Sequence, residues 1–165
     1  MVALPSDFLY AEKLISRSHD CSADLFQAIY EAARRLAPTD SFYLCWIERP
    51  DEQLRFVYHC DGDFYGPGNL VSFGGGPTTK VATTGRPVVM ADESERNGLK
   101  MVPFGDEETQ SAAAVHWPLR VSVDRDGLPD AVLSVQSYKG GVYSAEALAA
   151  VEWLALRAEQ ALRKA

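Results

Sequence analysis

Apolar residues recur at every third or fourth position in three segments of the chain, which is the spacing of an amphipathic helix. A short helix is predicted over residues 8–18, ending near His19. A second is predicted from Ser22, a residue type that caps helix starts, to a stop at Pro38, and a third from Ser144 to near the end of the chain. The apolar stripe of the second helix consists of Leu25, Phe26, Ile29, Tyr30, Ala33 and Leu36.

Four other segments have the length and composition of strands. Residues 42–48 (FYLCWIE) are apolar at both parities, as expected for a central strand that is covered on both faces. Residues 54–60 alternate, with Leu54, Phe56 and Tyr58 on the buried side. A turn at residues 49–52 joins these two strands into a hairpin, and residues 112–123 and 131–138 predict a second hairpin.

Residues 71–92 connect the two hairpins and read VSFGGGPTTKVATTGRPVVMAD. They predict a strand, a glycine turn, one short helix over residues 77–84 that stops at Gly85, and a strand over residues 87–92. Residues 61–68 and 93–110 are predicted loops. The whole pattern predicts an α+β fold, with a central, mostly antiparallel sheet, the N- and C-terminal helices on one face, and the short helix and the loops over the other.

The order of these segments resembles the GAF domain, a family of small-molecule sensor modules. Residues 81–85 (VATTG) match its V-A-x-T-G helix end, and residues 87–92 (PVVMAD) match its P-V-x-x-x-D strand. Residues 116–119 (HWPL) and 131–135 (AVLSV) match two later strands of the family pattern. On this resemblance, residues 1–21 are an N-terminal helical extension and residues 22–165 are the GAF domain.

The resemblance also implies where a ligand binds and how binding is reported. GAF domains hold a small molecule over the sheet face that the short helix and the loops cover. Their first and last helices commonly form a homodimer bundle that passes the signal to a kinase, a cyclase or a transcription-factor module. The resemblance therefore implies a sensory or regulatory protein of the bacterial signal-transduction type.

The length and the net charge of the chain indicate which kinds of partner it does not bind. The chain has 165 residues, the length of one domain, and a formal net charge of −7 from 16 basic and 23 acidic residues. This charge opposes binding to nucleic acid. No apolar run approaches the roughly 18 residues of a membrane helix, and the N-terminus lacks the features of a signal peptide. We therefore expect a cytoplasmic protein that binds neither nucleic acid nor membrane.

The three cysteines, Cys21, Cys45 and Cys60, are widely spaced and form no CxxC arrangement. Neither a disulfide framework nor a metal site is expected, and Cys45 is interpreted as a small buried apolar residue. The sequence leaves the identity of any cofactor unknown. A free methionine sulfoxide reductase of the GAF family needs thiols near its pocket. Residues 61–165, where that branch carries its catalytic cysteines, contain none here, so we expect a protein that is not an enzyme.

The glycine turn at residues 74–76 precedes the start of the short helix, and Lys80 lies one turn into it. Backbone N–H groups at a helix start can receive an anion, so this segment is a candidate anion contact. The segment is better explained as a tight turn that leads the chain into the helix, and the anion contact is kept as the alternative.

The second hairpin has one apolar and one polar face. If no bulge interrupts its register, His116, Ser134 and Gln136 share the polar face, where a ligand or the side chains themselves can satisfy their hydrogen bonds. Three aromatic residues beside the covering loops complete the candidate ligand-binding set, although each can instead belong to the core. They are Tyr43, Tyr58 and Phe73.

Two functions outside enzymology fit these features. The first is a ligand-binding sensor that forms a homodimer through its terminal helices. The second is a GAF domain without ligand, whose pocket is filled by its own side chains and which serves for dimerisation. Cyclic-nucleotide binding is not supported, because Asn97, Lys100, Phe104, Asp106 and Glu107 follow the order but not the spacing of the corresponding motif.

Overall fold

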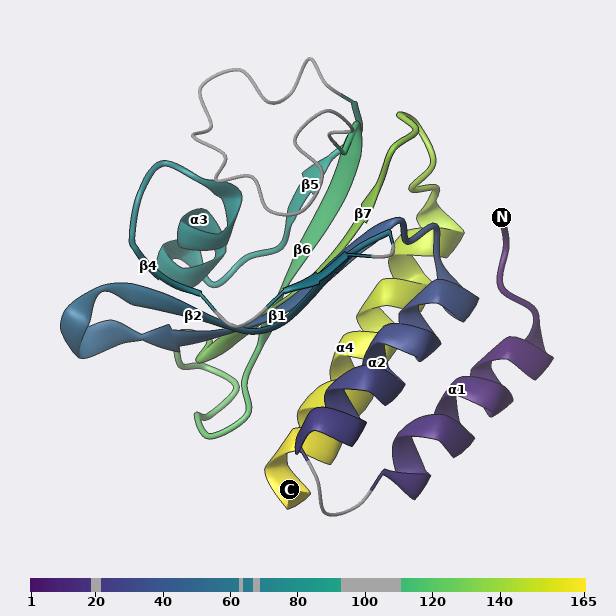
Figure 1. Ribbon diagram of the computed structural model, residues 1–165, viewed down its shortest axis with the longest axis horizontal. Helices are drawn as coiled ribbons and strands as arrows, with labels where there is room; N and C mark the ends of the chain where they lie inside the picture. Colours follow the sequence, from purple (N-terminus) through teal and green to yellow (C-terminus); the bar gives the residue numbers. More distant parts are fainter. Residues whose placement is uncertain (19–21, 63, 67–68, 93–110) are drawn as a thin grey trace.

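A computed structural model describes residues 1–18, 22–62, 64–66, 69–92 and 111–165. Within these ranges, an antiparallel sheet carries three helices on one face and one short helix on the other (Figure 1). The helices are α1 (Pro5–Arg17), α2 (Ser22–Leu36), α3 (Pro77–Thr84) and α4 (Ala145–Lys164), with a 3-10 turn η1 (Arg49–Asp51). The strands are β1 (Ser41–Glu48), β2 (Gln53–Asp61), β3 (Phe64–Gly66), β4 (Leu70–Ser72), β5 (Val88–Met90), β6 (Ala113–Leu119) and β7 (Ala131–Ser137). The predicted α+β architecture is confirmed.

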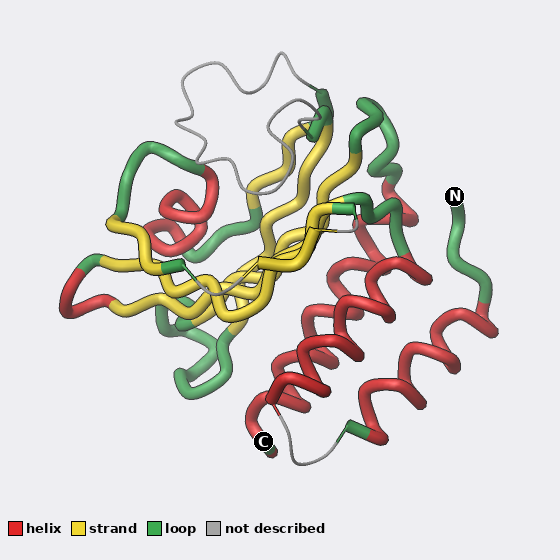
Figure 2. The backbone as a smooth tube through the Cα atoms, viewed as in Figure 1, coloured by secondary structure: helices red, strands yellow, loops and turns green. Residues whose placement is uncertain are grey.

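The seven described strands form one sheet in the order β3-β2-β1-β7-β6-β5, and β4 pairs with the half of β2 that β3 does not reach. Every described pairing is antiparallel. The two predicted hairpins are β1–β2 and β6–β7, and they meet where β7 pairs with β1 at the centre of the sheet (Figure 2). Because β1 and β7 are paired on both sides, their side chains are the best placed to form a site.

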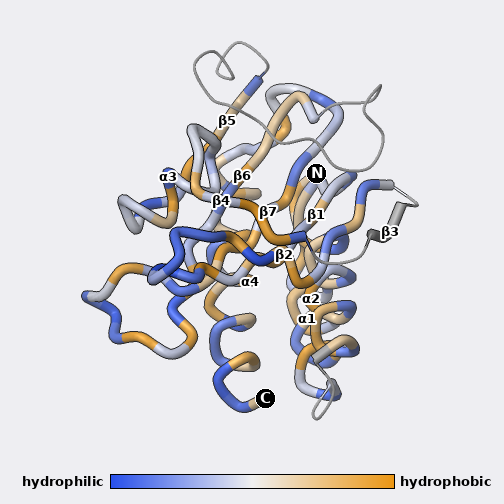
Figure 3. Tube along the Cα trace, turned by 60° about the vertical axis from the view of Figure 1, so that its left-hand side comes forward, coloured by the Kyte–Doolittle hydropathy of each residue, from blue (hydrophilic) through white to orange (hydrophobic). Residues whose placement is uncertain are grey.

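The larger hydrophobic core lies between the sheet and the helices α2 and α4. Hydrophobic and hydrophilic positions alternate along these helices (Figure 3), as the predicted apolar stripes require. The fully or nearly fully buried residues of this core include Leu25, Ile29, Leu36, Phe42, Val115, Leu133, Val135 and Leu154. Burial of these side chains supplies the main favourable free energy of folding.

Helix α1 packs against α2 and α4 and contributes Ala11 and Ile15 to this core. The Asp7 carboxylate accepts a hydrogen bond from the Leu4 backbone N–H at 2.7 Å and pairs with Arg35 of α2 at 2.6 Å. The rings of Phe8 and Trp153 of α4 meet edge to face at 5.1 Å. These contacts hold residues 1–18 against the domain, while the division of the chain at residue 21 stays a prediction.

Helix α3 covers part of the opposite face. It begins at Pro77 after an extended Gly76 and ends at Gly85, whose left-handed φ of 70° lets its N–H bond to the Val81 carbonyl at 2.8 Å. A smaller cluster of apolar side chains, in which Val81 and Ala82 are completely buried, lies beneath α3. The predicted short helix and its glycine stop are confirmed.

A β-bulge in β2 corrects the predicted pattern of the first hairpin. Leu44 pairs with Tyr58 but the next residue of β1, Cys45, pairs with Phe56, so Val57 has no counterpart. The extra residue reverses the alternation of β2 beyond this point. Tyr58 therefore faces the core under α2 and α4, and not the face that carries Tyr43.

Other differences concern element ends. β6 stops at Leu119 rather than residue 123, because the Asp130 carboxylate caps the following turn by accepting the backbone N–H of Val121 at 2.7 Å. A short strand, β3, lies within the segment predicted as a loop. α4 starts after Ser144, whose hydroxyl accepts the Ala147 N–H at 3.2 Å as a predicted cap does. The predicted loop over residues 93–110 lies outside the described residues.

Candidate ligand site

A row of buried side chains crosses the α3 face of the sheet on four neighbouring strands. Tyr43 of β1 lies opposite His59 of β2 and Ser134 of β7, and Ser134 lies opposite His116 of β6. His116 and Ser134 are completely buried. The prediction that His116, Ser134 and Gln136 share one face of an unbulged hairpin is confirmed by this register.

Tyr43 contacts residues of both the sheet and α3. Its hydroxyl lies 2.5 Å from the Thr78 hydroxyl of α3 and 2.7 Å from Nδ1 of His116. Its ring packs edge to face on Phe56 at 5.0 Å. One phenol thereby joins the centre of the sheet to the helix above it, so α3 cannot move from its position without breaking this contact.

Burial keeps both members of this pair uncharged at neutral pH. It raises the pKa of Tyr43 far above its ordinary value, against the hydrogen bonds of Thr78 and Ser134, which lower it. Burial also lowers the pKa of His116 to about 3. The His116 ring is therefore a neutral imidazole, with one ring nitrogen that donates a hydrogen bond and one that accepts.

The second ring nitrogen of His116 is the exception in this network. Nε2 is buried, and within the described part of the chain it has no hydrogen-bond partner. Val88, the residue opposite His116 on β5, offers only an apolar side chain. Leaving a buried polar atom unpaired costs about 1–3 kcal/mol. A polar group of a ligand placed beside Nε2 would therefore form a hydrogen bond that the described residues do not provide.

Gln136 lies two residues after Ser134 on β7, on the same face of the sheet. It pairs with Ala114 of β6 and is 7% exposed. Its Nε2 donates to the Ser134 hydroxyl at 3.2 Å. Of the two alternatives left open for the polar face, mutual hydrogen bonding is realised for Tyr43, Ser134 and Gln136, whereas His116 keeps one nitrogen available.

A side chain of α3 accepts a hydrogen bond from the backbone of the glycine turn that precedes this helix. The Gly74 N–H donates to the Thr79 hydroxyl at 3.0 Å, which accounts for the turn without a bound anion. Lys80 is exposed on α3. An anion contact at these residues stays a prediction. Phe73 is half-buried and packs against the cluster beneath α3, on the same face as Tyr43.

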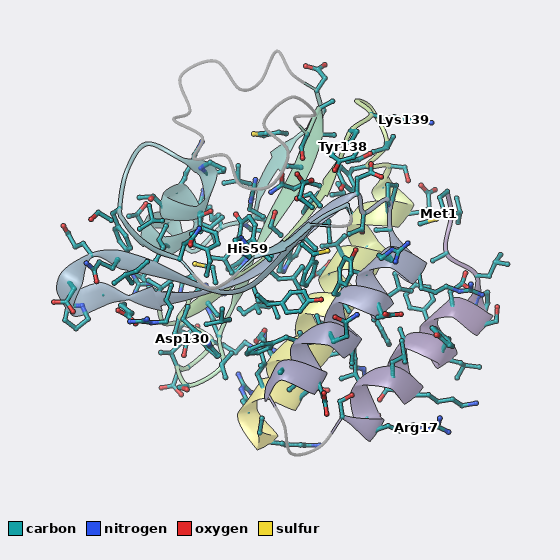
Figure 4. All side chains as sticks on the ribbon, in the orientation of Figure 1. Met1, Arg17, His59, Asp130, Tyr138 and Lys139 are labelled. Carbon is teal, nitrogen blue, oxygen red and sulfur yellow. The ribbon has the colours of Figure 1, made fainter. Side chains whose placement is uncertain are left out.

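Two residues of this face escaped the sequence analysis. The alternation along residues 54–60 puts His59 on the face opposite Tyr58, which the sequence places among the candidate ligand-binding residues. The bulge at Val57 instead brings His59 to the face of Tyr43, and in Figure 4 it lies beside the sheet on the side away from the long helices. Thr78 was not singled out, although it precedes Val81 and Ala82 by three and four positions and so shares their buried helix face. That spacing was the available signal for Thr78.

The described cysteines are not placed for catalysis. Cys45 and Cys60 are buried free thiols, and Cys60 belongs to the core under α2 and α4. Burial raises the pKa of the Cys45 thiol well above its ordinary value, which disfavours a reactive thiolate. Among the described residues, no three His, Cys, Asp or Glu side chains gather into a group that could hold a metal. None of the described helices combines the length and apolarity needed to cross a membrane.

Comparison with known proteins identifies the family. The model of the GAF domain matches residues 22–163. A search of the curated proteins found no match. Among solved structures, the chain is similar to the GAF domain of a phosphoenolpyruvate-protein phosphotransferase from Coxiella burnetii, with a TM-score of 0.72, 15% identity, and coverage of 95% of this chain and 93% of that one.

Two further structures share the fold. Residues 122 to 287 of a methyl-accepting chemotaxis protein align with a TM-score of 0.72 and 18% identity over 95% of this chain and 96% of that one. The free methionine-R-sulfoxide reductase of Neisseria meningitidis, solved with its substrate, aligns with a TM-score of 0.66 and 16% identity over 98% and 93%. A chemotaxis protein, a domain of a phosphotransferase and a reductase thus share this fold. The family match over residues 22–163 establishes that the chain belongs to the GAF domain family.

Proposed function

We propose that this GAF domain is a sensory or regulatory module that binds a small molecule on the α3 face of the sheet and reports binding through its terminal helices. The observation that carries the proposal is the completely buried His116, whose Nε2 has no partner among the described residues while Nδ1 is bonded to Tyr43. Perturbed, buried polar groups of this kind gather at binding sites more often than in ordinary cores.

Binding at this place is coupled to a change in the cover of the sheet. Because His116 is completely buried, a ligand reaches Nε2 only when covering groups shift. The described part of the cover is α3, which is held to Tyr43 through Thr78. A ligand that rearranges the Tyr43 hydrogen bonds therefore acts directly on α3.

Two arginines connect the end of α3 to α4. The Arg120 guanidinium donates to the Gly85 carbonyl at 3.2 Å and to the Gly127 carbonyl at 2.8 Å. The backbone carbonyl of Arg120 in turn accepts from Arg163 of α4 at 2.6 Å. Movement of α3 can thus reach the last turn of α4, and this supports signalling from the ligand side of the sheet to the terminal helices.

The alternative of a ligand-free dimerisation module has one observation in its favour. The hydroxyls of Tyr43 and Thr78 are hydrogen-bonded to each other beneath α3, as expected where a pocket is filled by its own side chains. The partnerless Nε2 of His116 argues against it, since a site kept only for packing gains nothing from an unmade hydrogen bond.

We further propose that the domain is regulatory and not catalytic. Cys45 and Cys60 are buried, so neither provides the accessible thiolate that sulfoxide reduction needs. The output partner is proposed to be a kinase, cyclase or transcriptional module, and the cytoplasmic location expected from the sequence stays a prediction.

A thermal-shift screen tests the binding proposal. Nucleotides, amino acids, aromatic acids and small anions are each added to the purified chain. A ligand present at about one hundred times its dissociation constant stabilises the folded state by about 2.7 kcal/mol, which raises the melting temperature by several degrees. The shift is expected to vanish in His116→Ala and Ser134→Ala. It is expected to persist in Ser122→Ala, a control at an exposed position. No shift from any class would favour the ligand-free module.

Dimerisation is a separate prediction. Helix α1 exposes Leu9 and Tyr10, which are 65% and 47% exposed, and α4 exposes Leu156. We expect these apolar side chains to pair across a two-fold axis. Light scattering should give about twice the 18.1 kDa mass of the chain, and Leu9→Glu should lower it toward one chain. A wild-type mass near one chain would contradict the prediction.

A further inference from the structure

The hydrogen bonds on the α3 face run in one direction, and this direction fixes what the partnerless nitrogen of His116 can offer. The groups involved are the side chains of Gln136, Ser134, Thr78, Tyr43 and His116. Each hydroxyl has one proton to donate, an amide NH2 only donates, and a neutral imidazole has one donor and one acceptor nitrogen. The order of donation therefore follows from accounting for each proton in turn.

The accounting starts at Gln136. Its Nε2 donates to the Ser134 oxygen at 3.2 Å, so the Ser134 proton is free to point elsewhere, and the Tyr43 hydroxyl is a hydrogen-bond neighbour of Ser134. The Thr78 hydroxyl lies 2.5 Å from the Tyr43 oxygen. Among the described residues, neither the Ser134 hydroxyl nor the Thr78 hydroxyl donates to another acceptor, so we assign both protons to the Tyr43 oxygen.

Tyr43 thus accepts two hydrogen bonds, from Ser134 and from Thr78, and has its own proton left to donate. Nδ1 of His116 lies 2.7 Å from its hydroxyl. If Tyr43 donates there, Nδ1 is the acceptor nitrogen and the ring proton is on Nε2. The opposite arrangement, with Nδ1 donating to Tyr43, would require Tyr43 to donate to Thr78 or to Ser134. The hydroxyl that accepted this proton would then have no acceptor for its own proton among the described residues.

We infer that His116 presents an Nε2–H donor beneath α3, and that the ligand of this domain carries a hydrogen-bond acceptor, such as a carboxylate, another oxyanion or a carbonyl, at that position. The inference rests on the proposed function in assuming that a ligand binds here, and it adds the polarity of the ligand group. Lowering of the His116 pKa by burial keeps the ring from gaining a second proton, so the donor is neutral. A cationic or purely donating group would meet a donor and find no acceptor at Nε2.

The tautomer can be measured in the ligand-free protein. Long-range proton–nitrogen NMR spectra of the 15N-labelled chain distinguish a protonated from an unprotonated ring nitrogen. We expect His116 to have a protonated Nε2 and an unprotonated Nδ1, and His116→Gln identifies its signals by their loss. In Tyr43→Phe the donor to Nδ1 is removed, and the Nε2–H preference should weaken. A protonated Nδ1 in the wild type would overturn the inference, whatever the screen for ligands finds.

The polarity of the ligand group is tested with two small planar probes of similar shape. Formate only accepts hydrogen bonds, whereas formamidinium only donates them. At constant ionic strength, sodium formate should shift the Nε2 and Nε2–H signals of His116 and formamidinium chloride should not, relative to sodium chloride. A response to formamidinium alone, or to neither probe, would overturn the inference.

Two substitutions at His116 form a matched pair. The amide of His116→Gln can place an N–H near the position of Nε2, whereas the shorter His116→Asn ends near the position of Nδ1 and leaves Nε2 without a substitute. We expect the apparent dissociation constant for formate, measured by thermal shift, to rise about tenfold or more in His116→Asn and much less in His116→Gln. Equal losses in both variants would contradict an Nε2 contact. If compounds bind in the screen and the loss is equal, the proposed function stands and the inference fails.

Discussion

Replacing Tyr58 by alanine is expected to lower the free energy of unfolding by about 3–5 kcal/mol, the range for removing a large aromatic side chain from a core. Tyr58 is 3% exposed and its ring lies 5.9 Å from Tyr30 and 6.0 Å from Phe42 on the helix side of the sheet. None of these neighbours can fill the space that its ring leaves, because they are held by α2 and β1. Urea unfolding followed by circular dichroism measures the loss.

Two control variants separate packing from other causes. Tyr58→Phe keeps the ring and removes the hydroxyl, which donates a hydrogen bond to the exposed Gln27, so it should cost about 1 kcal/mol or less. Phe56→Ala removes a half-buried ring from the other side of the sheet and should cost less than Tyr58→Ala. A small effect of Tyr58→Ala, together with an altered ligand response, would place Tyr58 on the α3 face and contradict the bulge.

Tyr58 also shows where reasoning from the sequence stops. The alternation along residues 54–60 correctly identified a strand, because apolar and polar residues repeat with period two. A bulge adds one residue without changing the composition of the strand, and here both Val57 and Tyr58 are apolar enough to face a core. The sequence therefore predicts the strand but not the reversal of faces, which depends on its pairing with β1.

The second hairpin was predictable in more detail. His116, Ser134 and Gln136 have the same parity, so any register without a bulge brings these three residues to one face, and the observed pairing of His116 with Ser134 has no bulge. The sequence could not predict the hydrogen bond that joins the sheet to α3. The contact between Tyr43 and Thr78 joins residues 35 positions apart, and only the placement of α3 over the sheet reveals it.

The hydrogen bonding of His116 in the candidate site could not be predicted from the sequence either. From the sequence, His116 is a polar residue on a strand that either contacts a ligand or is satisfied by its neighbours. The structure shows that the two ring nitrogens of His116 differ. Nδ1 is hydrogen-bonded to Tyr43, whereas Nε2 has no partner in the described residues. This asymmetry gives the ligand its expected polarity, and it exists only because four strands align their side chains in one row.

Acidification is expected to destabilise the folded domain through His116. Its pKa is lowered to about 3 in the folded state by burial, while the ordinary value near 6.5 applies to the unfolded chain. Between these values the unfolded chain binds more protons, so stability falls as the pH drops below about 6.5. At pH 4.5, two units below that value, the loss from this residue relative to pH 7.5 is about 3 kcal/mol, taking 1.36 kcal/mol for each unit.

Other groups also titrate in this range, so the contribution of His116 has to be isolated by difference. The Asp7 carboxylate, whose pKa is lowered first by its hydrogen bond from Leu4 and further by Arg35, adds an acid dependence of its own. His116→Gln cannot be protonated, and it keeps Asp7 and every other titrating group. Urea unfolding at pH 7.5 and pH 4.5 should therefore show a decrease for the wild type that is about 3 kcal/mol larger than the decrease for His116→Gln.

The comparison does not depend on how stable His116→Gln is at neutral pH, because only the change with pH is used. A direct measurement accompanies it: the ring signals of His116 in the folded wild type should stay those of a neutral imidazole down to pH 4.5. Equal pH dependence in the two proteins, with a ring that becomes charged near pH 6, would show that His116 is exposed to water in solution. It would then be hydrated at Nε2, and the case for a ligand at that nitrogen would be lost with the buried donor.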